Sequence, residues 1–159
     1  MYQIQKHPLI TWEHKLRQGR LFNEVSACAP NPNGPDANER YSCTFWFGQP
    51  QPYQDIAKQY QCYLEDGYDD QTYWSNIDPL RPNFGVWCTL FIAFDNHHPL
   101  ISKFLNLWYQ QTLEHTTQDQ VGFPYAAQKL NMIPYTLPDQ TIRGDYDYNS
   151  LFIKRLHAQ

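Results

Sequence analysis

A carboxylate and a carboxamide stand side by side at Asp119 and Gln120, in the stretch TTQDQVGFPY (116–125). A carboxylate accepts hydrogen bonds and protons from hydroxyl groups, and an amide supplies a donor group and an acceptor. The pair is therefore suited to holding a hydroxyl-bearing substrate. The same residues also fit a helix start. Thr117 and Gln120 have the spacing of a capping box, and Asp119 would lie in the first turn, where the helix dipole favours a negative charge.

A proline weighs against the capping interpretation. Pro124 lies where the interior of a helix that began near Thr117 would need a backbone N–H group. A helix that began at Pro124 would leave Asp119 and Gln120 in a short turn facing a cleft. The residues alone leave both interpretations open.

A second polar group follows the most apolar run, VWCTLFIAF (86–94), which we expect to form a buried strand. Asp95, His97 and His98 come directly after it, and loops at the carboxyl ends of strands often carry sites in α/β folds. Asp95 and His97 are therefore candidate metal ligands. A complete site normally needs three or more converging groups, and a histidine before a proline is commonly an exposed residue at a helix start.

The elements that would position these residues are of both kinds. Apolar spacings and end signals predict helices over 7–29, from Tyr53 to a stop at Gly67, from Pro99 to about 114, and over 125–130. Strands are predicted at 42–47, 86–94 and near 151–156, with 132–138 extended and loops at 30–40 and 68–83. This mixture predicts one α/β or α+β domain over residues 1–159.

Composition excludes some classes of protein. The net charge of -4 and the pI of about 5.8 argue against a nucleic-acid partner, because a phosphate backbone is bound by a basic face. The four cysteines are widely spaced, which argues against a structural zinc site. Aromatic residues make up 16%, which fits a dense core and also flat surfaces for sugars, bases or protein partners.

The length of the apolar segments bears on where in the cell the protein is found. The amino-terminal residues have no uninterrupted apolar segment of the secretory type, and the run 86–94 is too short to span a bilayer. We therefore expect a soluble, cytoplasmic protein with no membrane span.

The segment HHPLISKFLNLWYQQTLEHTTQDQVGFPYAAQKLNM (97–132) resembles a glycosyltransferase-like family known from plant mucilage-related proteins and from bacterial and viral polysaccharide enzymes. The family pattern is a helix containing "LW", a polar break, and then "(R)DQ.SF.Y...KL". Two upstream helices are weaker matches. LFNEVSAC (21–28) resembles the family's "YxEaxac" helix, with Glu24 as its acid, and IAKQYQCYLEDGY (56–68) resembles its "QxxxYxxeGy" helix. His7, or alternatively His14, resembles a histidine that precedes the Glu helix.

The resemblance implies a GT-A-type mixed α/β domain, of which this chain resembles the acceptor-side half. It departs from the family in two ways. Gln118 stands where the family has an Arg, and no Asp-x-Asp motif stands at a strand end before His7. Asp145-Tyr146-Asp147 has the right letters but lies late in the chain, after Arg143-Gly144. The nucleotide-binding half is then absent, replaced or supplied by a second chain.

The activity that the resemblance implies is transfer of a sugar, hexosyl in type, from a nucleotide-sugar donor to a glycan or small hydroxyl acceptor, with a manganese or magnesium ion. Asp119 would bind the acceptor or act as the base, and Gln120 would hold a second hydroxyl. Further substrate contacts are predicted at Trp108, Tyr125, Glu24 and Arg143, and metal ligands at His157, Asp95 and His97. Each has a structural alternative: aromatic residues at helical spacing are more often core, Glu24 would be a solvent-facing acid, and His157 would belong to the tail.

Two rival functions remain open at the level of the sequence. The first is a non-catalytic module that binds a carbohydrate or a protein, which the missing donor motif favours. The second is a structural or assembly protein whose aromatic residues form an obligate interface.

Overall fold

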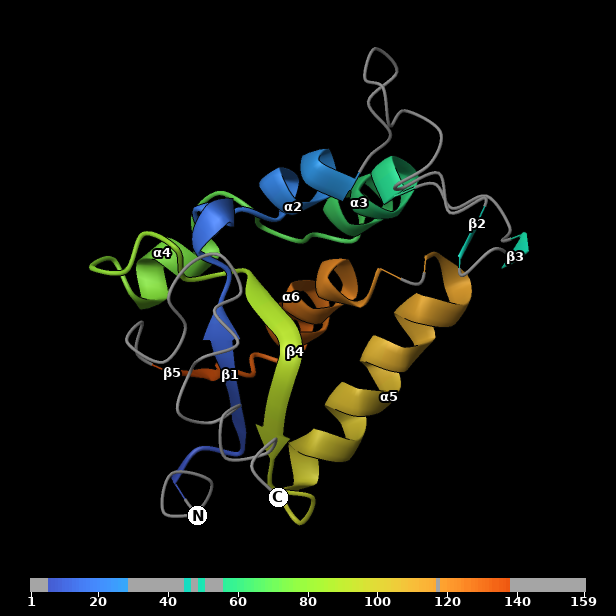
Figure 1. The fold of residues 1–159 in the computed structure, drawn as a ribbon. Helices are drawn as coiled ribbons and strands as arrows, with labels where there is room; N and C mark the ends of the chain where they lie inside the picture. The colour runs from blue at the N-terminus through green and yellow to red at the C-terminus, as the bar shows by residue number, and fades with distance from the viewer. Residues whose placement is uncertain (1–5, 29–44, 47–48, 51–55, 117, 138–159) are drawn as a thin grey trace, which may run out of the picture.

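The computed structural model describes residues 6–28, 45–46, 49–50, 56–116 and 118–137. Its elements, in chain order, are β1 (Leu9–Glu13), the 3-10 helix η1 (Lys15–Arg17), α2 (Leu21–Cys28), β2 (Phe45–Trp46), β3 (Gln49–Pro50), α3 (Ile56–Glu65), α4 (Tyr73–Ile77), β4 (Trp87–Phe94), α5 (Pro99–Glu114), α6 (Asp119–Lys129) and β5 (Tyr135–Leu137). Helices and strands are mixed along the chain, which confirms the predicted α/β class (Figure 1).

The main sheet has three strands in the order β4-β1-β5. β1 runs antiparallel to β4 and parallel to β5, while β2 and β3 form a separate antiparallel pair. The register between β1 and β4 shifts after Thr11, which pairs with Ile92 while Trp12 pairs with Cys88. The Thr11 hydroxyl lies 3.2 Å from the Cys88 carbonyl oxygen and 2.9 Å from that of Phe91, so it stabilises the carbonyl groups of this bulge.

The helix predicted over 7–29 is wrong in its first part. Residues 9–13 form the central strand β1, and only residues 21–28 form the predicted helix, α2. Leu9, Ile10, Thr11 and Trp12 are all buried. A central strand covered on both faces has apolar residues at successive positions, and here their spacing imitated a helical period.

Helix α6 lies at the centre of the molecule, between the sheet and the pair α2 and α3 (Figure 1). All its residues from Val121 to Ala127 are buried. Phe123, Ala126 and Ala127 pack into one apolar cluster with residues of the sheet and α5. Val121 and Tyr125 pack into a second cluster with α2 and α3. The N-terminus of α6 is therefore held in place from both sides.

Several other predictions are confirmed. α5 begins at Pro99 after the cap His98, α3 ends two residues before Gly67, and β4 and β5 form where extended segments were predicted.

Two elements differ from the prediction. The predicted loop 68–83 contains a short helix, α4. β4 is less buried than predicted, with Leu90 73% exposed, because it is an outer strand of the sheet in the described part of the chain.

Two glycines mark a close backbone crossing between the η1–α2 connection and the segment before β4. Gly19 and Gly85 have φ angles of +63° and +134°. A Cβ atom on Gly19 would lie 2.5 Å from the carbonyl oxygen of Phe84, and one on Gly85 would lie 2.5 Å from that of Gly19. Both positions therefore need glycine, and the crossing holds the start of α2 in a fixed position.

Some predictions fall outside the described residues. These are the loop at 30–40, most of the strand at 42–47 and the strand near 151–156. Within the described ranges, no helix combines the length and the apolar character needed to cross a membrane.

Candidate functional site

Glu24 lies on the buried face of α2, although the sequence favoured a solvent-facing acid at this position. The helix buries Leu21, Glu24, Val25 and Cys28, which are spaced as one helical face. Glu24 is 2% exposed. Removing a charged carboxylate from water costs free energy, so a carboxylate is buried only where other groups stabilise its charge.

Three side chains donate hydrogen bonds to the Glu24 carboxylate. Arg17 forms an ion pair with Oε2, and the Cys28 thiol lies 3.2 Å from Oε1. Gln120 at the start of α6 donates from Nε2 to Oε1 at 2.8 Å, across 96 positions of sequence. This cluster of Glu24, Arg17, Cys28 and Gln120, called the Glu24 cluster below, joins η1, α2 and α6.

The hydrogen-bond partners of Glu24 stabilise its ionised form. Burial raises the pKa of this carboxyl, but the hydrogen bond and the positive charge of Arg17 lower it, as do the hydrogen bonds from Cys28 and Gln120. The net effect is a pKa below the ordinary value. Glu24 is therefore an ionised acceptor whose donors are already in place, which makes it a group that positions others and a poor candidate for a base.

His14 lies beside the Glu24 cluster and is also buried. Its pKa is lowered, chiefly because burial disfavours the imidazolium form. Glu24 acts in the opposite direction and Arg17 in the same one. His14 is one of the two histidines that the family resemblance offered before the Glu helix, and it is the one that the fold places near Glu24.

The start of α6 differs from the predicted capping box. The helix begins at Asp119 with Gln118 as its N-cap, so it does not begin at Pro124, and Pro124 lies inside it. The Gln118 side chain makes no capping bond, and the Gln120 amide reaches Glu24. The tertiary contact with Glu24 therefore takes the side chain that a capping box would use.

Asp119 lies next to the Glu24 cluster and is exposed. Its Oδ1 accepts a hydrogen bond of 2.9 Å from the backbone N–H of Gln120. Its backbone carbonyl oxygen accepts a 2.7 Å bond from Nε1 of Trp108. The carboxylate of Asp119 is thus oriented by the N–H of Gln120, its backbone is held by Trp108, and its side chain remains accessible to a ligand from solvent.

The two aromatic candidates for sugar stacking both make packing contacts. The ring of Trp108 makes an edge contact with Phe123, with centroids 5.2 Å apart. Tyr125 stacks on Tyr63 at 4.0 Å, and its hydroxyl donates to Asp66. Their contacts support the structural alternative given above, and Trp108 contributes to the site by holding Asp119.

The predicted metal ligands Asp95 and His97 form a turn before α5. Oδ1 of Asp95 accepts a 3.0 Å bond from the backbone N–H of His97, and Nδ1 of His98 accepts one from the N–H of Leu100. In the part of the chain that the structure describes, no three His, Cys, Asp or Glu side chains are grouped so as to hold a metal ion. His157 and Arg143 lie outside the described residues.

Sequence reasoning missed two residues of the cluster, Cys28 and Arg17. Arg17 lies in a different element from Glu24 and seven positions before it, so helical spacing does not connect the two. The usable signal was an arginine placed one short turn before a helix with a glutamate on its apolar face. Burial raises the pKa of the Cys88 thiol. The negative charge of Glu24 raises it further, which places Cys88 near the Glu24 cluster.

Comparison with known proteins adds no family to this geometry. No protein-family model, curated protein or solved structure matches the chain.

Proposed function

We propose that this chain is a glycosyltransferase-related domain of the GT-A type whose acceptor site is formed at the start of α6. The observation that carries the proposal is the hydrogen bond between Glu24 and Gln120. These residues belong to two separate segments that resemble motifs of one family, and the fold brings them into contact. Two unrelated matches would not be expected to converge in this way.

The geometry refines the roles of the pair. Gln120 uses its amide nitrogen to bind Glu24, which leaves its side-chain oxygen as an acceptor for a ligand hydroxyl. Asp119 is exposed and oriented by Gln120 and Trp108, so it is the group that would accept the hydroxyl proton of an acceptor. Glu24 and Arg17 act behind them as positioning residues.

The donor side of the reaction is part of the proposal. A nucleoside diphosphate leaves with negative charge, which a divalent cation or positive side chains must stabilise. Arg17 places one guanidinium in the cluster. A manganese or magnesium ion, and a second chain that binds the nucleotide, remain proposed components.

The first experiment is a thermal-shift panel with UDP, GDP, TDP and ADP, each with and without manganese, followed by a panel of mono- and oligosaccharides. A ligand bound by the folded state raises Tm by mass action. The Asp119→Ala variant should lose the saccharide response and any sugar transfer, whereas Glu65→Gln, which removes an exposed acid on α3, should keep both. If Asp119→Ala retained sugar transfer, the assignment would be refuted.

The same panel separates the rival functions. A saccharide response without any effect of nucleotide or metal indicates a non-catalytic carbohydrate-binding module. A manganese-dependent nucleotide response places a donor site in this chain. No response, together with a stable oligomer, indicates an assembly protein.

A further inference from the structure

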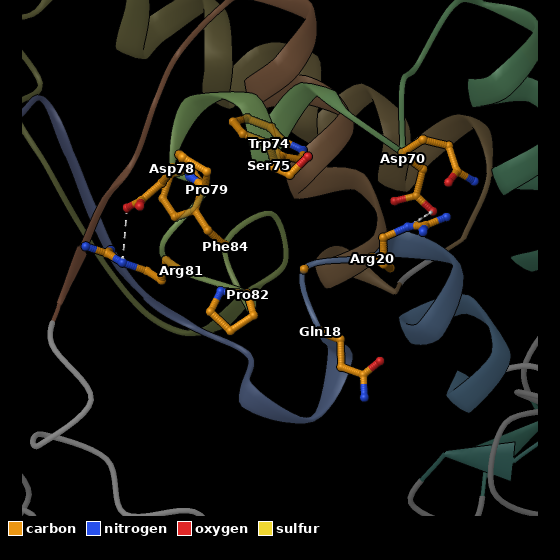
Figure 2. A pocket seen from close by; sticks show the side chains of 12 residues that line it. Gln18, Arg20, Asp70, Trp74, Ser75, Asp78, Pro79, Arg81, Pro82 and Phe84 are labelled. Atoms are coloured by element: carbon orange, nitrogen blue, oxygen red, sulfur yellow. Dashed lines mark ion pairs between the residues drawn. The ribbon is translucent and has the colours of Figure 1, made fainter.

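A small pocket is lined in part by the residues that directly follow Arg17 in the chain. Three stretches of chain line it: residues 18–20, residues 70–75 and residues 78–84 (Figure 2). Its volume is about 80 Å³. A cavity needs about 10–15 Å³ of such space to hold one water molecule, so this pocket has room for a small group of a few heavy atoms.

The wall of the pocket is rigid. Trp74 and Phe84 are buried and meet edge to face with centroids 5.9 Å apart. Gly19 is held against the carbonyl oxygen of Phe84 by the backbone crossing described above. Pro79 and Pro82 complete the apolar side (Figure 2). A pocket held by a core tryptophan and a backbone crossing is formed before any ligand arrives.

Arg20 supplies an unsatisfied donor at one side of the pocket. Its Nε atom is buried and has no hydrogen-bond partner. The nearest acid is Asp70, whose Oδ2 lies 3.7 Å away, beyond hydrogen-bonding distance. A buried N–H group of a guanidinium without an acceptor is unfavourable, so an oxygen atom that reached it would stabilise the folded protein.

Asp70 makes an ion pair with Arg20 but no hydrogen bond to its Nε, and its carboxylate accepts three hydrogen bonds from other groups. The donors are the backbone N–H groups of Leu21 and Phe22, at 2.6 and 2.9 Å, and the hydroxyl of Tyr60, at 2.8 Å. The carboxylate therefore compensates the positive N-terminus of α2. The charge of Arg20 is left only partly compensated.

Arg81 lies on the opposite rim. Its Nε is 3.2 Å from Oδ2 of Asp78, and Figure 2 shows it turned toward that carboxylate. Both side chains of this pair are well exposed, and an exposed ion pair contributes little to stability. The Arg81 guanidinium also lies over the ring of Phe84, 5.6 Å from its centroid, so it is a second cation placed beside the apolar wall of the pocket.

We propose that this pocket binds one small oxyanion, a phosphate or carboxylate group, with Arg20 as its main donor and Arg81 as a cation at the rim. Arginine is the side chain that best binds such oxygens, two arginines line the pocket, and its volume admits one small group. The site is distinct from Asp119 and Gln120, and it does not depend on the proposed function.

The test measures binding of inorganic phosphate and of acetate by calorimetry and by amide chemical shifts, against chloride at matched ionic strength. Arg20→Gln removes the donor, and Ser75→Tyr fills the pocket from the exposed face of α4. Lys103→Gln removes one positive charge from an exposed position of α5 and serves as the control. A folded spectrum is required of each variant before its binding is compared.

We expect Arg20→Gln to weaken binding about ten- to hundredfold, as loss of a charged hydrogen bond does. We expect Ser75→Tyr to weaken it about tenfold or more, because the larger side chain would occupy the pocket. Lys103→Gln should change it by less than about twofold, since distant exposed charges are screened. Preference for phosphate identifies a phosphoryl group as the ligand, and preference for acetate identifies a carboxylate. The proposal is overturned if neither anion acts more strongly than chloride, or if both pocket variants bind as the parent protein does.

Discussion

Two buried carboxylates stabilise the same helix in different ways. Asp70 is 4% exposed and forms an ion pair with Arg20, the residue directly before α2. Glu24 is 2% exposed and forms an ion pair with Arg17, the last residue of η1. Asp70 is held chiefly by backbone N–H groups and a tyrosine hydroxyl. Glu24 is held by side chains, one of them from the distant helix α6.

The difference separates an acid held by backbone groups from one held by side chains. Backbone donors are fixed by the helix itself, so Asp70 has one arrangement and acts as a cap supplied from another part of the chain. Side-chain donors can exchange one acceptor for another. Under the proposed function, the contact between Glu24 and Gln120 is the one that a substrate would reorganise, next to the exposed carboxylate of Asp119.

Asp70→Ala should have the largest effect on stability. It leaves two backbone N–H groups and the Tyr60 hydroxyl without their acceptor, and we expect a loss of about 3 kcal/mol in the free energy of unfolding. Urea denaturation measures it. Asp78→Ala, which breaks an exposed pair with Arg81, is the control and should cost less than about 1 kcal/mol. If the two variants lost the same free energy of unfolding, the backbone hydrogen bonds of Asp70 would contribute no more to stability than an exposed ion pair.

The contact between Glu24 and Gln120 should show as a coupling energy. A double-mutant cycle with Glu24→Ala and Gln120→Ala is expected to give about 1–2 kcal/mol, because one partner is charged and buried. The matched control pairs Glu24→Ala with Gln128→Ala, since Gln128 lies on the same helix but binds the backbone of Asp69. A coupling no larger than that of the control would mean that α2 and α6 do not meet through these side chains.

Acid should weaken the protein through the Glu24 cluster. The folded-state pKa of His14 is lowered from 6.5 and that of Glu24 from 4.5, so the unfolded chain binds more protons as each group titrates. The free energy of unfolding is therefore expected to fall as the pH drops below about 6.5, and to fall further below about 4.5 as Glu24 becomes protonated.

Urea denaturation at a series of pH values measures this dependence. In Glu24→Gln, which has no carboxylate at this position, the stability curve should be flatter below about pH 4.5 than in the parent protein. An unchanged slope in that variant would show that other carboxylates carry the acid sensitivity.

Local signals in the sequence were enough to find α3 and α5. α5 combines a proline at its start with a regular apolar stripe, and α3 precedes a glycine of positive φ. β1 was misread because both of its faces are covered, so its apolar residues do not alternate. Local patterns do not record which strands will flank a segment.

Only part of the candidate site could be predicted from the sequence, for a related reason. Asp119 and Gln120 attracted attention as adjacent polar residues, and Glu24 did so through the family resemblance. The burial of Glu24 and its pairing with Arg17 depend on how α6 and η1 pack against α2. Asp70 capping α2 from 48 or 49 positions away could not be predicted, because ordinary caps come from adjacent residues.

The smallest effect on stability is expected at the residue proposed to matter most for function. Asp119→Asn keeps the shape of an exposed side chain and retains an acceptor for the N–H of Gln120, so unfolding should change by less than about 0.5 kcal/mol. Saccharide binding should nevertheless be lost, because the charged acceptor is gone. A loss of about 1 kcal/mol with binding intact would instead mean that the charge of Asp119 acts chiefly on the positive N-terminus of α6, since a charge in the first turn contributes up to about that much. Stability and binding measured on this one variant thus decide between the two interpretations that the residues alone left open.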